Sequence, residues 1–180
     1  GQPIRQVTSV ASFFVSRVDG RVDPMLDKAG DPKQLRSRIA IANAALAYRT
    51  FQESLETPRW KRLAGAGGQA QRPLWASTST KDPKLPDTYY VEALVAAQTV
   101  NTLPPDTFDA YSGHGAPDLS RVQGEMATAP GQLRDLAASG IDLKAVTTFL
   151  EEDGVAKFAA SYRQLLAGIA SKAEALTAHR

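Results

Sequence analysis

The 180-residue sequence contains no cysteine and only two histidines, His114 and His179, which lie far apart in the chain. The lack of cysteine excludes disulfides, thiolate catalysis and Cys-ligated zinc, and the two histidines lack the spacing of metal ligands. No metal site is therefore expected. The sequence also lacks any run of roughly 20 apolar residues and any signal-peptide pattern, so we expect no membrane association and a cytoplasmic location.

A strong excess of one charge is also missing, because 21 basic residues face 19 acidic ones and leave a formal net charge of +2. This balance argues against a nucleic-acid or membrane-surface partner, although it leaves a local anion site possible. With 43% hydrophobic and 22% charged residues, the composition is typical of one folded unit with a hydrophobic core.

Three short runs of β-branched and aromatic residues predict buried strands, at residues 7–15, 72–77 and 99–103. The first run is expected to stop at Ser16–Gly20. Between the runs we expect a helix that is capped by Asp31-Pro32 and reaches about Glu56, followed by shorter helical pieces at 59–63 and 90–95. From Gly131 onward the pattern is helical, and Gly154 is expected to interrupt it.

Strands that alternate with helices predict parallel pairing through right-handed crossovers, as in an α/β sheet or barrel. Three such strands leave a strand edge open. An eight-stranded barrel commonly needs about 250 residues, so this chain is long enough for its last three strands only. We therefore expect an incomplete fold that needs a partner segment.

In parallel α/β folds the functional side chains gather where strands end, because the following loops meet at one rim. Two cations with several hydroxyls and no clustered carboxylates favour a phosphate over a metal or a glycosidic bond. The candidate binding residues are Ser12, Phe14, Arg17, Ser77, Lys81 and Asn101.

Each candidate also has a plainer interpretation. Arg17 can form a surface ion pair with Asp19 or Asp23, and Lys81 can form one with Asp82. Ser12 and Ser77 can be small residues in a packed barrel interior, and His114 is expected in a loop without a catalytic role. Phe13 and Phe14 must point to opposite faces of their strand, so only one of them can line a site.

Three ordered motifs resemble transaldolases of the longer-chain subfamily. Residues 9–19, SVASFFVSRVD, resemble strand six of that barrel, residues 72–78 followed by Lys81-Asp82-Pro83 resemble strand seven, and residues 99–104 resemble strand eight. Residues 140–143 and 154–158 resemble the family's C-terminal helices. The resemblance implies the C-terminal portion of a (β/α)₈ TIM barrel, with the last three βα units in residues 1–127 and the C-terminal helices in residues 128–180 of a single domain.

The resemblance further implies a transferase of the pentose phosphate pathway. It would move a dihydroxyacetone unit from sedoheptulose 7-phosphate to glyceraldehyde 3-phosphate through a lysine Schiff base, with no metal or cofactor. Ser12, Phe14 and Arg17 match the family's serine, phenylalanine and phosphate-binding arginine of strand six, and Ser77 matches a serine of strand seven. Ser79 stands where many members have a second arginine, so Lys81 is expected to take that role.

The same resemblance places the Schiff-base lysine and the acid/base Asp and Glu on strands that would precede Gly1. We therefore expect no catalytic residue in this chain, no activity from it alone, and the N-terminal part of the same barrel as its partner. Two alternatives stay open: an inactive phosphate-binding or self-associating half-barrel module, and a different aldolase in which Lys81 itself forms the Schiff base.

Overall fold

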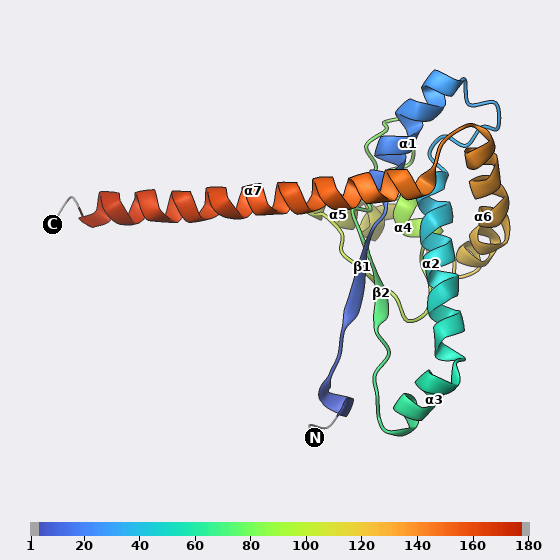
Figure 1. The fold of residues 1–180 in the computed structure, drawn as a ribbon, viewed down its shortest axis with the longest axis horizontal. Helices are drawn as coiled ribbons and strands as arrows, with labels where there is room; N and C mark the ends of the chain where they lie inside the picture. The colour runs from blue at the N-terminus through green and yellow to red at the C-terminus, as the bar shows by residue number, and fades with distance from the viewer. Residues whose placement is uncertain (1–3, 178–180) are drawn as a thin grey trace. The chain divides into compact units, whose positions relative to one another are not determined.

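The structure is a computed structural model that describes residues 4–177. It divides into two compact units, Gly1–Leu143 and Lys144–Arg180. The first unit contains, in chain order, η1 (Ile4–Gln6), β1 (Val10–Phe14), α1 (Ser16–Ala29), α2 (Ile39–Leu55), α3 (Pro58–Gly65), β2 (Arg72–Ala76), α4 (Tyr89–Ala93), β3 (Val100–Asn101), α5 (Pro105–His114) and α6 (Arg121–Ala138). The second unit is the continuation of one long helix, α7 (Leu143–Thr177) (Figure 1).

The three strands form one parallel sheet in the order β1-β2-β3. Phe13 of β1 is in register with Trp75 of β2, and Trp75 is in register with Asn101 of β3. The prediction of three adjacent parallel strands in chain order is confirmed. β1 is an edge strand of this sheet, and each strand is shorter than the apolar run that predicted it.

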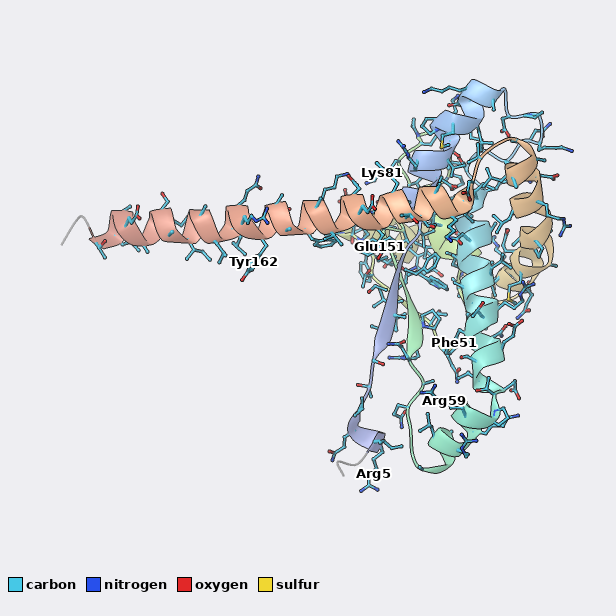
Figure 2. All side chains as sticks on the ribbon, viewed as in Figure 1. Arg5, Phe51, Arg59, Lys81, Glu151 and Tyr162 are labelled. Atoms are coloured by element: carbon cyan, nitrogen blue, oxygen red, sulfur yellow. The ribbon has the colours of Figure 1, made fainter. Side chains whose placement is uncertain are left out.

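One face of the sheet is covered by helices, and the other face of β1 is exposed. Phe13 packs edge-on against Trp75 with ring centroids 5.9 Å apart, and both rings border a hollow of about 360 Å³ that Phe51 of α2 also lines. Figure 2 shows Phe51 on α2. Side chains alternate along a strand, so Val10 and Phe14 lie on the opposite face, where they are 39% and 38% exposed. The predicted division of Phe13 and Phe14 between two faces agrees with this arrangement.

The core of the first unit is built by α1, α2 and α6. Val18, Val22 and Leu26 recur every four residues on α1 and are buried, which is the spacing of one helix face. α6 packs along α2 through Val122, Ala129 and Leu136, which are also buried. The indole nitrogen of Trp75 donates to the Leu94 carbonyl at 3.0 Å, so this large buried ring leaves no unsatisfied donor.

Two helix boundaries differ from the prediction in the first half of the chain. The first strand ends at Phe14, before Ser16 as expected, but the helix that follows it was not predicted: α1 begins at Ser16 despite Gly20 and Pro24 within it. Asp31 does not begin a helix either: it accepts from the backbone nitrogens of Leu35 and Arg36, at 2.8 and 3.1 Å. Asp31, Gln34 and Ser37 all have positive φ, which no α-helix tolerates, so α2 starts only at Ile39.

The helical second half also differs in detail. α6 begins ten residues before Gly131 and contains Pro130, and α7 continues through Gly154 without interruption. The expected boundary between residues 127 and 128 falls inside α6, and the single barrel domain stays a prediction. Within residues 4–177, no helix combines the length and apolar character needed to cross a membrane.

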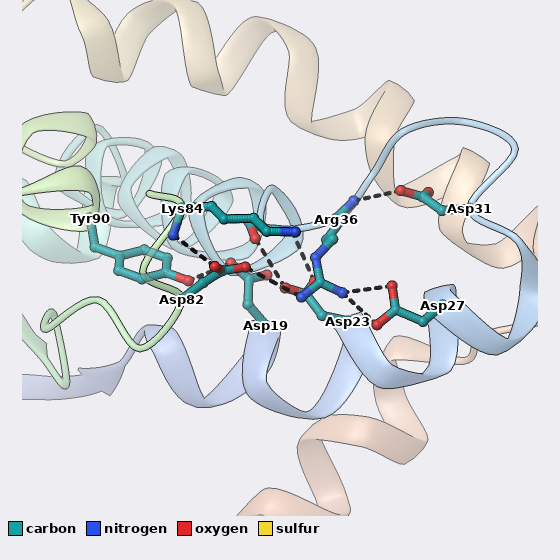
Figure 3. Close-up of polar contacts among 9 residues, drawn as sticks. Asp19, Asp23, Asp27, Asp31, Arg36, Asp82, Lys84 and Tyr90 are labelled. Atoms are coloured by element: carbon teal, nitrogen blue, oxygen red, sulfur yellow. Dashed lines mark hydrogen bonds and ion pairs between the residues drawn. The ribbon is translucent and has the colours of Figure 1, made fainter. Parts of the chain in front are cut away.

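The start of α2 is held by two carboxylates of α1. Arg38 at the N-cap of α2 makes no side-chain capping bond. Asp19 accepts instead from the backbone nitrogen of Ala40 at 2.7 Å, and Asp23 accepts from the backbone nitrogen and hydroxyl of Ser37 at 2.9 and 3.0 Å. Figure 3 shows both carboxylates on α1, near Arg36 and Tyr90. These bonds satisfy N–H groups that a helix leaves unpaired at its N-terminus.

Burial of Asp19 makes this cap sensitive to pH. Desolvation raises the pKa of Asp19 from 3.8 to about 7, against the opposing bonds from Ala40 and from the Tyr90 hydroxyl, which donates to it at 2.9 Å. The folded protein therefore holds this proton more tightly than the unfolded chain. The contribution of Asp19 to stability is therefore fully present below its unfolded pKa and is lost as pH rises from about 4 to about 7.

We predict that Asp19→Asn flattens this pH dependence, because the amide still accepts from Ala40 but does not ionise. Between pH 4 and pH 7, the free energy of unfolding of the parent should decrease relative to that of the variant by on the order of 3 kcal/mol. Urea unfolding at several pH values measures both. Asp109→Asn, an exposed aspartate on α5, is the control and should keep the parental slope; equal slopes in all three proteins would contradict the prediction.

Candidate phosphate-binding site

The end of β1 brings two of the predicted residues together. Arg17 lies in the first turn of α1, and its guanidinium carbon is 4.5 Å from the centroid of the Phe14 ring. A guanidinium over an aromatic face is attracted by the ring and held in orientation. Ser12 precedes Phe14 by two residues and therefore shares its exposed face. Phe14 and Arg17 are thus in contact at the end of β1, and Ser12 lies two residues before Phe14 on the same strand.

The ion pair that offered a plainer interpretation of Arg17 is not formed. Asp19 and Asp23 accept from the backbone and side chains that surround the start of α2. Among the ion pairs of residues 4–177, none involves Arg17. The binding of a phosphate by Arg17 stays a prediction.

Ser77 follows β2 and lies beside the end of β1. Its hydroxyl is 3.2 Å from the hydroxyl of Ser16, and its carbonyl accepts from the Ser16 backbone nitrogen at 3.0 Å. Ser77 has φ +58°, a left-handed conformation that non-glycine residues seldom adopt and that concentrates at functional sites. The structure therefore brings Ser77 next to the turn that carries Arg17.

Asn101 is placed differently from the other candidates. Its register partner is Trp75, on the helix-covered face of the sheet, whereas Ser12 and Phe14 lie on the exposed face. Its side-chain oxygen accepts from the hydroxyl of Thr78, which is fully buried, at 3.0 Å. The structure does not bring Asn101 together with Ser12, Phe14 and Arg17.

Lys81 is exposed and borders a hollow of about 450 Å³ beside α1, lined also by Asp19, Asp23, Arg36 and Tyr90. The expected pair with Asp82 is not among the ion pairs of the described residues. Asp82 bonds to the Arg36 guanidinium at 3.3 Å and to the Lys84 backbone nitrogen at 2.9 Å, and these contacts, the backbone bond first, lower its pKa.

Sequence reasoning missed Arg36, which joins α1 to the loop after β2 through Asp27 and Asp82. Ser16 and Thr78 stand among the polar residues that the sequence places at the strand ends, and each bonds to a candidate binding residue. Nothing in their spacing indicates a bond across strands. His114 ends α5 rather than lying in a loop, and its Nε2 is 2.8 Å from Asp87.

Comparison with known proteins identifies the family of this chain. Residues 4–169 match the model of the transaldolase/fructose-6-phosphate aldolase family. This chain belongs to that family. The transaldolase of Acidothermus cellulolyticus is 50% identical over 175 residues, which is 97% of this chain and 47% of that relative. The transaldolase of Parafrankia sp. is 52% identical over 92% of this chain and 46% of its own length.

The transaldolase of Mycobacterium tuberculosis is 46% identical over 169 residues, covering 92% of this chain and 45% of the relative. The chain thus spans about half the length of the curated relatives it matches. Within residues 4–177, no group of three or more His, Asp or Glu side chains is arranged to hold a metal ion. The strand ends of this transaldolase-family chain instead carry the Arg17 guanidinium, the Phe14 ring and the hydroxyls of Ser12 and Ser77.

The strained backbone of Ser77 yields a prediction that separates its conformation from its hydroxyl. Ser77→Ala and Ser77→Gly both remove the contact with Ser16, but only glycine adopts φ +58° without steric cost. Glycine relieves the backbone strain but has more conformational entropy in the unfolded chain, which opposes folding. The net result should be a glycine variant that is more stable than the alanine variant by about 0.5–1 kcal/mol. Chemical unfolding of the two variants measures the difference, and an alanine variant as stable as the glycine variant would show that Ser77 is unstrained.

Proposed function

We propose that this chain is the C-terminal part of a transaldolase of the pentose phosphate pathway. In this proposal it completes a (β/α)₈ barrel that transfers a dihydroxyacetone unit from sedoheptulose 7-phosphate to glyceraldehyde 3-phosphate. The observation that carries the proposal is about 50% identity to proteins named transaldolase over nearly the whole chain. A cytoplasmic location is part of the proposal, because sugar phosphates are charged and do not cross the hydrocarbon of a membrane.

Arg17 is the residue we expect to bind the sugar phosphate. It follows the end of a parallel strand, where barrel enzymes place their substrate loops, and its guanidinium is oriented by Phe14 rather than by a carboxylate. A guanidinium offers two parallel N–H donors to phosphate oxygens. Ser12 and Ser77 would add single hydroxyl donors, and Lys81 a point charge from the next loop.

The Schiff-base lysine would come from the half of the barrel that this chain does not span. A lysine acts as a nucleophile when burial or a neighbouring cation favours its neutral form, whereas Lys81 is exposed. We therefore propose that the chain supplies much of the phosphate site, that an N-terminal part supplies the nucleophile and the acid/base groups, and that this chain alone is inactive.

Replacing Arg17 in the complete enzyme tests the phosphate role. Arg17→Ala should weaken transition-state binding of phosphorylated substrates by about 1.5–3 kcal/mol, because one set of charge-assisted hydrogen bonds is lost. Arg17→Lys should restore part of the loss, since it keeps the charge without the planar fork. Values of kcat/KM for phosphorylated and unphosphorylated ketoses measure the effect.

The unphosphorylated ketose is the internal control for folding. A loss in Arg17→Ala that is equal for both sugars would assign Arg17 a structural role. Asn101→Ala is a useful comparison, because Asn101 bonds to buried Thr78 on the other face. Asn101→Ala should lower the free energy of unfolding, and any change in kcat/KM should be equal for the two sugars.

The aldolase alternative for Lys81 has a separate test. Borohydride reduction of the complete enzyme with a ketose phosphate fixes the Schiff base covalently, and peptide mapping then locates it. We expect the label outside this chain and unchanged labelling in Lys81→Met. A label on the peptide that contains Lys81 would overturn the proposed division of roles.

A further inference from the structure

Basic side chains gather at the end of the first unit where the strands begin. Residues 56–72 hold four basic residues against one acidic residue, Glu56, although the whole chain has a net charge of only +2. η1 adds Arg5, which lies beside this segment, because a Cβ on Gly67 would be 3.4 Å from the Arg5 Cβ. We call this surface the basic end, and its cations are Arg5, Arg59, Lys61, Arg62 and Arg72.

The arginines of the basic end have no carboxylate partner among the described residues. Lys61 pairs with Glu56 at 2.9 Å, but none of the ion pairs within residues 4–177 involves an arginine of the basic end. All of these arginines are exposed. Neighbouring cations without counter-charges repel one another, so the binding of an anion among them is favourable.

A hollow of about 570 Å³ opens at the basic end. Its volume lies within the range of about 300–1,000 Å³ that small-ligand sites occupy. Trp60 borders it from the first turn of α3, where the Thr57 hydroxyl accepts from the Trp60 backbone nitrogen at 3.2 Å and caps the helix. The polar and aromatic residues that line the hollow are Thr8, Ser9, Trp60, Gln69, Arg72 and Gln98.

Trp60 and Arg72 together favour a ligand that has both a flat ring and a negative charge. An indole is a stacking surface for a nucleobase, and a guanidinium binds a phosphate through two parallel N–H groups. The amide side chains of Gln69 and Gln98 offer both donors and acceptors to the edge of a base. Among the described residues that line the hollow none is Asp or Glu, which disfavours a metal ion or a cationic ligand.

We propose that the basic end is a nucleotide-binding site, in which a nucleobase stacks on Trp60 and the phosphate binds to Arg72. Arg5, Arg59 and Arg62 lie outside the hollow, where they suit further phosphates of the same ligand. These phosphates belong either to a free nucleoside polyphosphate or to successive nucleotides of a single strand. The proposal goes beyond the proposed function and does not depend on it.

The basic end is separate from the candidate phosphate-binding site. Arg72 begins β2, whereas Ser77 follows its last residue, and five residues at about 3.3 Å per residue separate the two by about 17 Å. Figure 2 shows Arg5 and Arg59 toward one end of the first unit and Lys81 toward the other. We therefore expect a bound nucleotide to leave the site around Arg17 open.

Isothermal titration calorimetry of the 180-residue chain with adenosine monophosphate tests the proposal. Trp60→Ala and Arg72→Gln should each raise the Kd by about tenfold or more, because one removes the stacking surface and the other the guanidinium. Trp60→Phe keeps a flat ring and should retain most of the affinity. The matched controls are Phe108→Ala on α5 and Arg134→Gln on α6, which replace an exposed ring and an exposed arginine elsewhere and should keep the Kd within about twofold. Circular dichroism checks the fold of each variant.

Adenosine triphosphate and a short single-stranded oligoadenylate distinguish the two sources of the nucleotide. Tighter binding of the oligoadenylate, with a salt dependence that Arg59→Gln combined with Arg62→Gln reduces, would identify a single strand as the ligand. Tighter binding of the triphosphate would identify a free nucleotide. Either result supports the proposal, provided that Trp60→Ala weakens the binding.

Four results would overturn the proposal and leave the proposed function standing. Equal affinities of Trp60→Ala and Phe108→Ala would show that no base stacks on Trp60. Inorganic phosphate that binds as tightly as adenosine monophosphate would indicate a simple anion site without base recognition. Binding that Arg17→Ala abolishes and Arg72→Gln preserves would place the nucleotide at the candidate phosphate-binding site. The absence of detectable binding to the parent chain would contradict the proposal directly.

Discussion

The first unit depends on the contact between two carboxylates of α1 and the start of α2. Asp19 and Asp23 lie one turn apart on α1, and together they accept from the backbone of Ser37 and Ala40. This contact fixes where α2 begins, and α2 is the helix that packs on the sheet and carries α6 along its length. Arg17 lies on the same helix as both carboxylates, so the contact that organises the core also holds the helix that presents the candidate phosphate-binding residue.

Burying the Asp19 carboxylate at the start of α2 costs electrostatic free energy. Burial raises the pKa of Asp19 to about 7, although Ala40 and Tyr90 both donate to the carboxylate. Two good donors therefore do not fully replace the water lost on burial. Asp19 and Asp23 bond at the start of α2, whereas the Arg17 guanidinium lies over the Phe14 ring at the end of β1. Residues two apart on a helix point to different sides, so Arg17 and Asp19 serve different surfaces.

Two surfaces of the chain are apolar and exposed. Val10 and Phe14 lie on the exposed face of the edge strand β1, and α7 exposes large apolar side chains such as Tyr162 and Ile169. Barrels remove strand edges by closing, and open edges otherwise invite association with other strands. These surfaces, together with relatives about twice as long, motivate the proposal that the chain belongs to a longer barrel protein.

Sequence reasoning did not predict several helix boundaries, because they depend on contacts between residues that are far apart in the chain. Asp31-Pro32 has the local pattern of a helix start, yet α2 begins at Ile39, where Asp19 and Asp23 supply the capping acceptors from another helix. Gly20 and Pro24 are poor helix formers by themselves, but α1 continues through them with Val18, Val22 and Leu26 buried on one face. A glycine inside a helix costs about 1 kcal/mol and a proline about 3 kcal/mol, and burial of that face offsets such costs.

The sequence alone determined the three strands, their parallel order and the family, because apolar periodicity and the ordered motifs at Ser9–Asp19 and Arg72–Thr78 are local properties of the chain. It also placed Phe13 and Phe14 on opposite faces, since strand geometry requires it. Only the tertiary structure decided that Phe14 orients Arg17 and that Asn101 pairs with buried Thr78 on the other face. Those assignments depend on register and on side-chain partners from separate elements, which spacing along one chain does not specify.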